Sequence, residues 1–191
     1  RGAEAARVDA RPREVSTAWT GSRSGDRIDV QWLTENYPRL VANLTDEHRA
    51  ALAAALELPI SALDAIQVGW WPDRRWWNPD TRQAEGAPGC WTFPECDAQG
   101  RIVGVGLRWP TGRKGQLAGG RRGLTLPEGW RERADPVLIV EGPSDALAGT
   151  CVGLNVIGRP SNCGGTELLT HLCRDRRVVI LGENEDRKSV V

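Results

Sequence analysis

The segment Pro136–Ala148 constrains the fold more than any other part of the chain. Its four apolar residues Val137–Val140, three of them β-branched, predict a short strand that is buried on both faces. The strand runs directly into Glu141, and a Gly-Pro pair then breaks it before a helix that Ser144 or Asp145 can cap. A carboxylate at the carboxyl end of a buried strand lies where open α/β sheets hold their ligands. The sequence therefore predicts an α/β domain with a site at this turn.

The same pattern returns near the end of the chain. Arg177–Leu181 reads as a second buried strand, and Glu183, Glu185 and Asp186 lie at its tip. Alternate residues of an extended tip point to the same side, so Glu183 and Glu185 can face one crevice together. Pairing of Glu183 with Asp186, or a solvated acidic turn, is the alternative. Two acidic strand tips in one small unit predict a divalent-metal site, because Mg²⁺ takes hard oxygen ligands.

Strands and helices alternate from residue 136 onward. Strands are expected at 137–140, 154–157 and 177–181, and helices at 144–151 and 165–173. This βαβαβ order predicts a parallel sheet.

A β-rich, basic segment precedes that unit. Cys90–Pro94 and Arg101–Trp109 read as strands joined by the turn Asp97–Gly100, which predicts a β-hairpin. From residue 101 to 133 the chain has eight basic residues against two acidic ones, with a glycine-rich loop at 112–123. Such a segment can neutralise phosphates, although a solvated face is the alternative. The candidate nucleic-acid or nucleotide contacts are Arg108, Arg113, Lys114, Arg121 and Arg122, with Arg159 after a later strand.

The rest of the chain is expected to be helical or irregular. Residues 1–30 read as a linker or disordered arm and residues 31–66 as a helical segment. Thr45 caps a helix that continues to Leu58, and Ser61–Asp64 has the form of a capping box that opens a second short helix. The β-rich unit then covers residues 67–133 and the α/β unit residues 134–191.

The amino-acid composition limits the kinds of partner and cofactor that we expect. The 25 basic and 25 acidic residues balance, and no apolar run approaches the roughly 20 residues that span a bilayer, so no membrane partner is expected. Five irregularly spaced cysteines predict reduced thiols in a cytoplasmic protein and no zinc site, with Cys151 and Cys173 in a core. Trp70, Trp71 and the pair 76–77 either stack unpaired bases or form an apolar mini-core, and we favour the mini-core.

The two acidic motifs also resemble a known family. A strand followed by Glu-Gly-x-x-Asp-Ala, with a later strand that ends in paired acids, resembles the Toprim domain of topoisomerases and primases. The primase branch, which includes primase-helicase-like proteins of phages and mobile elements, is the most similar. The order Phe-Pro, Asp-x-x-Gly, Ile-Val-Gly, Arg in the β-rich unit resembles the subdomain before Toprim in bacterial primases.

The resemblance implies a fold and a chemistry. The fold would be an incomplete Toprim-type parallel sheet preceded by a small α+β, hairpin-containing primase-like subdomain. Glu141 and Asp145 would be catalytic, and Glu183, Glu185 and Asp186 would bind Mg²⁺ or Mn²⁺. The second motif departs from the family's Asp-x-Asp, because Glu183 and Glu185 each carry one methylene more than Asp, which shifts the carboxylates outward.

The function implied is a DNA primase-like nucleotidyltransferase that makes RNA primers on single-stranded DNA during replication, with nucleotides as substrates and a helicase module as a further partner. A metal-dependent Toprim nuclease and a catalytically inactive DNA-binding remnant are the alternatives. Because the chain starts without Met and stops just after the second acidic motif, we expect it to be part of a longer protein, with its Toprim domain truncated.

Overall fold

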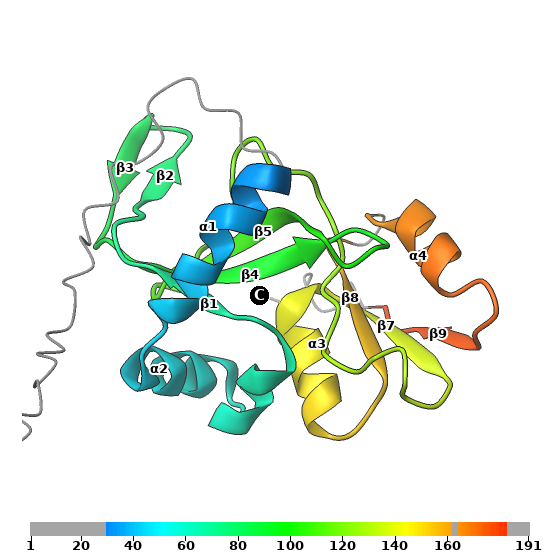
Figure 1. Cartoon of the computed structure of the whole chain (residues 1–191). Helices are drawn as coiled ribbons and strands as arrows, with labels where there is room; N and C mark the ends of the chain where they lie inside the picture. The colour runs from blue at the N-terminus through cyan, green and yellow to red at the C-terminus, as the bar shows by residue number, and fades with distance from the viewer. Residues whose placement is uncertain (1–29, 162–163, 183–191) are drawn as a thin grey trace, which may run out of the picture.

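The computed structural model describes residues 30–161 and 164–182 and has a mixed α/β architecture (Figure 1). The helices are α1 (Val30–Ala42), α2 (Asp46–Leu56), the 3₁₀ helix η1 (Ile60–Ala65), α3 (Gly142–Cys151) and α4 (Thr166–Leu172). The strands are β1 (Gly69–Trp71), β2 (Trp76–Asn78), β3 (Gln83–Glu85), β4 (Cys90–Cys96), β5 (Ile102–Arg108), β6 (Lys114–Gln116), β7 (Val137–Glu141), β8 (Val156–Arg159) and β9 (Val178–Ile180).

The strands form three sheets. An antiparallel sheet has the order β1-β4-β5-β6, a small hairpin pairs β2 with β3, and a parallel sheet has the order β8-β7-β9. The α/β class, the hairpin-containing unit and the parallel sheet expected from the sequence are therefore confirmed.

Helix α1 packs on the antiparallel sheet through Leu33, Tyr37 and Leu40, which are all buried. The Tyr37 hydroxyl donates to the carbonyl oxygens of Gln67 at 2.7 Å and Thr92 at 3.2 Å. Its burial raises the pKa of the phenol well above the ordinary value. These two bonds satisfy the polar end of a side chain whose ring belongs to the core.

Helix α2 begins as the sequence predicts, at the N-cap Thr45, whose hydroxyl accepts the backbone N–H of His48. The helix ends at Leu56, two residues earlier than expected, because Glu57 adopts a left-handed conformation with φ 56°. The capping box expected at Ser61–Asp64 is wrong. Pro59 precedes a 3₁₀ helix there, and Asp64 forms an ion pair with Arg49 instead.

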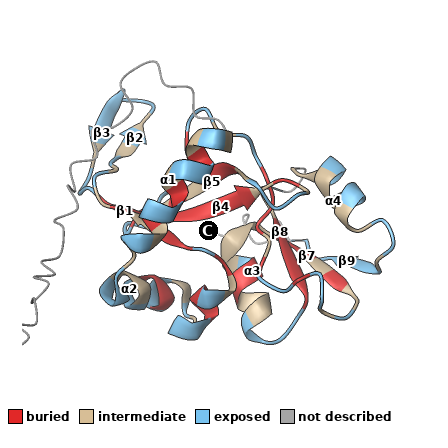
Figure 2. Cartoon of the chain, in the orientation of Figure 1, coloured by how far each residue is buried: buried red, intermediate tan, exposed pale blue. Residues whose placement is uncertain are grey.

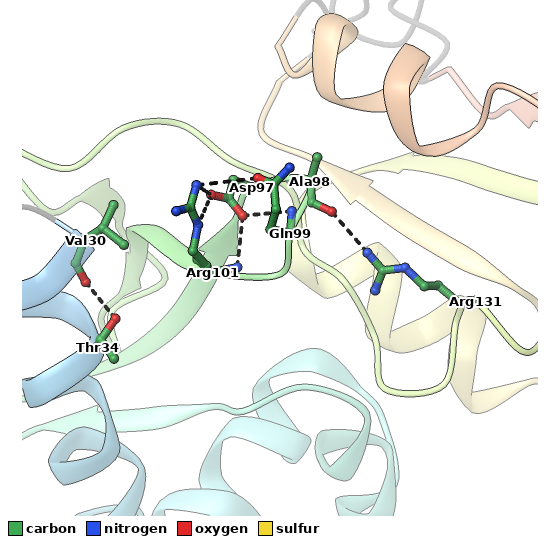
Figure 3. A network of polar contacts seen from close by, with 7 residues as sticks. All are labelled: Val30, Thr34, Asp97, Ala98, Gln99, Arg101 and Arg131. Carbon is green, nitrogen blue, oxygen red and sulfur yellow. Dashed lines mark hydrogen bonds and ion pairs between the residues drawn. The ribbon is translucent and has the colours of Figure 1, made fainter.

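The hairpin β4–β5 closes at the predicted turn (Figure 3). One carboxylate oxygen of Asp97 accepts the backbone N–H groups of Gln99 at 3.0 Å and Arg101 at 2.9 Å. Its other oxygen accepts Nε of Arg101 at 2.8 Å. Arg131, in the segment before β7, donates to the carbonyl of Ala98 at 3.1 Å. The turn is thus fixed both within itself and to the segment that leads into the parallel sheet.

Burial differs among the strands of the parallel sheet. Strands β7 and β8 are largely buried, whereas all three residues of β9 are exposed (Figure 2). The expectation that Arg177–Leu181 is a buried strand is therefore wrong. Strand β9 lies at the edge of the described sheet and pairs with β7, and its residues Val178, Val179 and Ile180 are 40%, 44% and 64% exposed.

Two residues join the antiparallel sheet to the parallel one. Leu124 exchanges backbone hydrogen bonds of 2.8 and 2.7 Å with Cys96 at the end of β4. Thr125 exchanges bonds of 2.8 and 2.9 Å with Gly158 in β8. Both joining residues are buried. Main-chain hydrogen bonds therefore run without a break from one sheet to the other.

Elements that lie far apart in the sequence pack together in one hydrophobic cluster. Leu147 of α3 packs in one cluster with Leu63 of η1 and Trp91 and Phe93 of β4. Cys151, expected in a core, is exposed, since it is the last residue of α3, while Cys173 is half-buried. No helix among the described residues is long and apolar enough to cross a bilayer.

Candidate active site

A cavity of about 430 Å³ lies between the β5–β6 hairpin and the first turn of α3. Five of the side chains predicted from the sequence line it: Arg108, Lys114, Arg122, Glu141 and Asp145. Phe93, Glu95, Gln116 and Thr125 complete much of its wall. Residues more than 30 positions apart in the chain thus meet in one hollow. Glu141 and Asp145 come from the β7–α3 turn, and the bases, with Glu95 beside Arg122, come from the antiparallel sheet and the loop after it.

The acidic wall is the turn from β7 into α3. Glu141 is the last residue of β7 and the N-cap of α3, and Gly142 follows with φ 79°. This left-handed conformation favours glycine, and it turns the chain sharply at the carboxyl end of the strand. The helix starts at Gly142, so Ser144 and Asp145 lie in its first turn and do not cap it, which corrects the sequence interpretation. An acid in that turn is favoured by the helix dipole.

The basic wall is the β5–β6 hairpin and the loop after it. Arg108 and Lys114 face each other across the two strands. Nε of Arg108 is buried and has no hydrogen-bond partner among the described residues. A buried donor without a partner is costly, so an acceptor supplied from outside, such as a phosphate oxygen, would be favoured here.

Arg122 is held by several acceptors. Its guanidinium lies 3.1 Å from a carboxylate oxygen of Glu95 and donates to Gln116 at 3.3 Å and to the carbonyl of Pro160 at 2.6 Å. Its side chain remains 50% exposed. Part of its charge is therefore available to a ligand in the cavity.

Glu95 is a cavity residue that the sequence did not single out. It is 7% exposed, and one of its oxygens accepts the backbone N–H of Gly123 at 2.9 Å. Burial raises the pKa of its carboxyl above the ordinary value, against the opposing effects of the Gly123 N–H and the Arg122 guanidinium. An acid within the otherwise buried strand β4 was the available signal, because buried acids are rare unless they are paired.

The other predicted basic residues lie elsewhere. The Arg113 guanidinium stacks 3.8 Å from the ring centroid of Trp76 and lies 3.9 Å from a carboxylate oxygen of Glu85. Arg121 is exposed, beside the cavity-lining Arg122. Arg159 pairs with Glu141 in the β7–β8 register, and its Nε is buried with no hydrogen-bond partner in the described part of the chain.

Part of the metal site expected from the sequence falls beyond the described residues. Glu183, Glu185 and Asp186 lie outside the described residues. Within residues 30–161 and 164–182, no three His, Cys, Asp or Glu side chains are grouped so as to hold a metal ion. Glu141 and Asp145 nevertheless line the same cavity, and Mg²⁺ often takes only one or two carboxylates from a protein. The donor chemistry of the acidic wall therefore fits a hard divalent cation.

Comparison with known proteins adds to this geometry. No protein-family model and no curated protein matches the sequence. The structure is similar to a DnaG primase catalytic domain solved with single-stranded DNA, with a TM-score of 0.60 and 18% identity over 83% of this chain and 64% of that one.

Two further similar structures are primases. The E. coli primase catalytic core has a TM-score of 0.58 and 19% identity, covering 84% of this chain and 64% of that one. The RNA polymerase domain of Mycobacterium tuberculosis primase DnaG, solved with double-stranded DNA, has a TM-score of 0.56 and 15% identity, covering 83% and 65%. This chain thus spans less than two thirds of each of these structures. Its fold is similar to that of part of a DnaG primase catalytic core.

Proposed function

We propose that this chain carries the catalytic cavity of a primase-like nucleotidyltransferase, which makes short RNA primers on single-stranded DNA. The observation that carries the proposal is the cavity in which Glu141 and Asp145 face Arg108, Lys114 and Arg122. The fold supports it, because similar structures are primase catalytic domains, one of which was solved with single-stranded DNA. The turn at Glu141 would belong to a Toprim domain.

The basic wall would bind phosphate. Arg108, Lys114 and Arg122 come from one hairpin and the loop after it, so they can contact successive phosphates of a nucleotide or a strand. Their charges would also stabilise the negative charge that develops on a phosphoryl group during transfer. The Nε of Arg108, which is buried without a hydrogen-bond partner among the described residues, would donate to such a phosphate.

The acidic wall, formed by Glu141 and Asp145, would take part in proton transfer. Glu141 lines the cavity at the end of β7, where it would accept the proton of an attacking 3′ hydroxyl as a general base. Asp145 lies one turn into α3 on the same side. Mg²⁺ or Mn²⁺, when bound by these acids together with the second motif, would supply Lewis-acid stabilisation of the transferred phosphoryl group.

Primer synthesis tests the proposal directly. The protein is incubated with a single-stranded template, Mg²⁺ and labelled ribonucleotides, and the oligoribonucleotide products are resolved on a gel. Glu141→Gln should lower product formation by about 10²-fold or more, because it removes the proton acceptor but keeps the side-chain shape. The matched control is Glu128→Gln, an exposed acid outside the cavity, which should leave the yield unchanged.

The result also separates the enzyme classes. Shortening of the template without incorporation of ribonucleotides would replace the primase proposal with a nuclease. Equal primer yields from Glu141→Gln and the original protein would remove Glu141 from the chemistry.

A further inference from the structure

Trp77 is not buried in the core. Its side chain is 58% exposed, whereas Trp71 is 2% exposed in the core. Trp76 lies under the Arg113 guanidinium, and Trp70 stacks on a histidine ring at 4.0 Å. Among the tryptophans that the structure describes, Trp77 alone is exposed to this degree. The aromatic mini-core favoured from the sequence thus accounts for its neighbours but not for Trp77.

The β2–β3 hairpin sets the direction of this side chain. Residues alternate between the two faces of a strand, so Trp76 and Asn78 share one face, while Trp77 lies on the other. The residue paired with Trp77 on β3 is Ala84, whose methyl group cannot cover an indole. The flat face of Trp77 is therefore left open by its own partner strand.

The opposite face of the hairpin is held firmly. Glu85 accepts hydrogen bonds of 2.7 Å from both Asn78 and Thr81, and it lies 3.9 Å from Arg113. The hydrogen bonds from Thr81 and Asn78 lower the pKa of the Glu85 carboxyl, with Arg113 adding to them. The hairpin is thus fixed to the main body through Arg113, and it presents Trp77 on a supported platform.

Two exposed arginines lie near Trp77 in the chain. Arg75 comes just before β2, where its guanidinium donates to the carbonyl of Gly86 at 2.6 Å, and Arg82 lies in the turn between β2 and β3. Residues 73–86 also contain three acids: Asp73 and Asp80 are exposed, and Glu85 is engaged with Arg113 on the other face. Arg75 and Arg82 are the cations of this hairpin that can reach the phosphates of a strand stacked on Trp77.

The β2–β3 hairpin is linked to the cavity through two residues that are adjacent in the chain. Arg113 contacts the hairpin through Trp76, and the next residue, Lys114, lines the cavity. Figure 1 shows the β2–β3 hairpin projecting from the body beside α1, away from the parallel sheet. Arg113 and Lys114 thus connect the hairpin with the basic wall of the cavity along the chain.

We propose that Trp77 is a stacking platform for an unpaired base of single-stranded nucleic acid, with Arg75 and Arg82 contacting the flanking phosphates. Every base has a π face, so such a contact is tolerant of sequence, and loss of one stacking aromatic weakens binding by on the order of tenfold. The inference rests on the proposed function only in naming the held strand as the template.

Binding of a labelled oligo(dT), measured by fluorescence anisotropy, tests the platform. Trp77→Ala should weaken binding about tenfold, and Trp77→Phe should restore most of it, because Phe keeps a π face. The double change of Arg75 and Arg82 to Ala should lower the log–log salt slope by about 1.4, or 0.7 for each lost phosphate contact. Ile60→Ala, at an exposed apolar residue elsewhere, should leave binding unchanged. Equal affinity of Trp77→Ala and the original protein would overturn the proposal, as would a Phe variant as weak as the Ala variant.

A second measurement uses the unaltered hairpin. With 5-fluorotryptophan incorporated, the ¹⁹F resonance that disappears in Trp77→Phe identifies Trp77, and it should shift when oligo(dT) is added. A resonance that does not move while DNA binds elsewhere would exclude the platform. Failure of the two proposals can be told apart, because absent primer synthesis with a shifted Trp77 resonance removes the enzyme activity and leaves the platform standing.

Discussion

Gly158 in β8 lies against Gly142 in the turn after β7. A β-carbon at position 158 would lie only 2.6 Å from the Gly142 carbonyl oxygen and 3.0 Å from the β-carbon of Thr125. The close approach of these two backbones holds the turn that carries Glu141, and it leaves no room for any other residue at position 158.

Gly158→Ala should therefore destabilise the protein and impair the cavity. The added methyl group must displace the backbone of Gly142 on one side and the side chain of Thr125 on the other, and overpacking of this kind costs roughly 1–3 kcal/mol. For a domain of this size each kcal/mol corresponds to about 2–4 °C in Tm, which thermal unfolding can resolve. Gly182→Ala is the control, because a β-carbon at position 182 meets nothing within 4 Å. Equal Tm values for the two variants would contradict the close approach.

Glu95 should make stability fall as pH rises. Its pKa is raised in the folded protein, so between the ordinary value of 4.5 and the raised value the folded state holds a proton that the unfolded state has lost. The original protein should therefore lose stability relative to Glu95→Gln as pH rises through this window. Denaturant unfolding at a series of pH values measures the difference. Parallel curves for the two proteins would show that the carboxyl is not perturbed.

Asp97 should act in the opposite direction. Although burial opposes it, hydrogen bonds from the backbone and side chain of Arg101 and from the backbone of Gln99 hold the pKa of this carboxyl below its ordinary value of 3.8. Its contribution is complete above that value and is lost as pH falls through the folded-state pKa. Asp97→Ala should cost about 1–3 kcal/mol at neutral pH, because two backbone donors lose their acceptor. Chemical unfolding of the variant at neutral and at acidic pH should show the gap closing on acidification.

The basic wall should determine the salt dependence of DNA binding. If Arg108, Lys114 and Arg122 each neutralise one phosphate, replacing all three by Ala should reduce the slope of log affinity against log salt by about 2 for a single strand. Arg39→Ala removes an exposed charge on α1 and should leave the slope as it was. A triple variant with the original slope would mean that these side chains do not contact phosphate.

The sequence predicted the elements whose signals are local. Thr45 marks a helix start, the turn at Asp97 joins two alternating strands, and the apolar run before Glu141 forms a strand, because each pattern is set by neighbours in the chain. Glu95 was missed because its burial depends on Arg122 and Gly123, which follow it by more than 25 residues.

The exposure of β9 likewise could not be predicted from the sequence. Val178–Ile180 has the apolar run of a buried strand, and only the tertiary arrangement shows that β7 is its one neighbouring strand in the described sheet. The cavity was predicted in part. Both of its walls were predicted as motifs, but the sequence does not show that they meet, because this depends on how the two sheets are joined.

That joint, the pair of residues Leu124 and Thr125, has a consequence for ligand binding. Because backbone hydrogen bonds connect both sheets, the acidic and basic walls of the cavity are set at a fixed separation when the chain folds. A ligand that enters the cavity would not need to draw two lobes together, so little of its binding energy would be diverted into ordering the protein. Replacing side chains on either wall would then change the contacts to the ligand and leave the span between the walls the same.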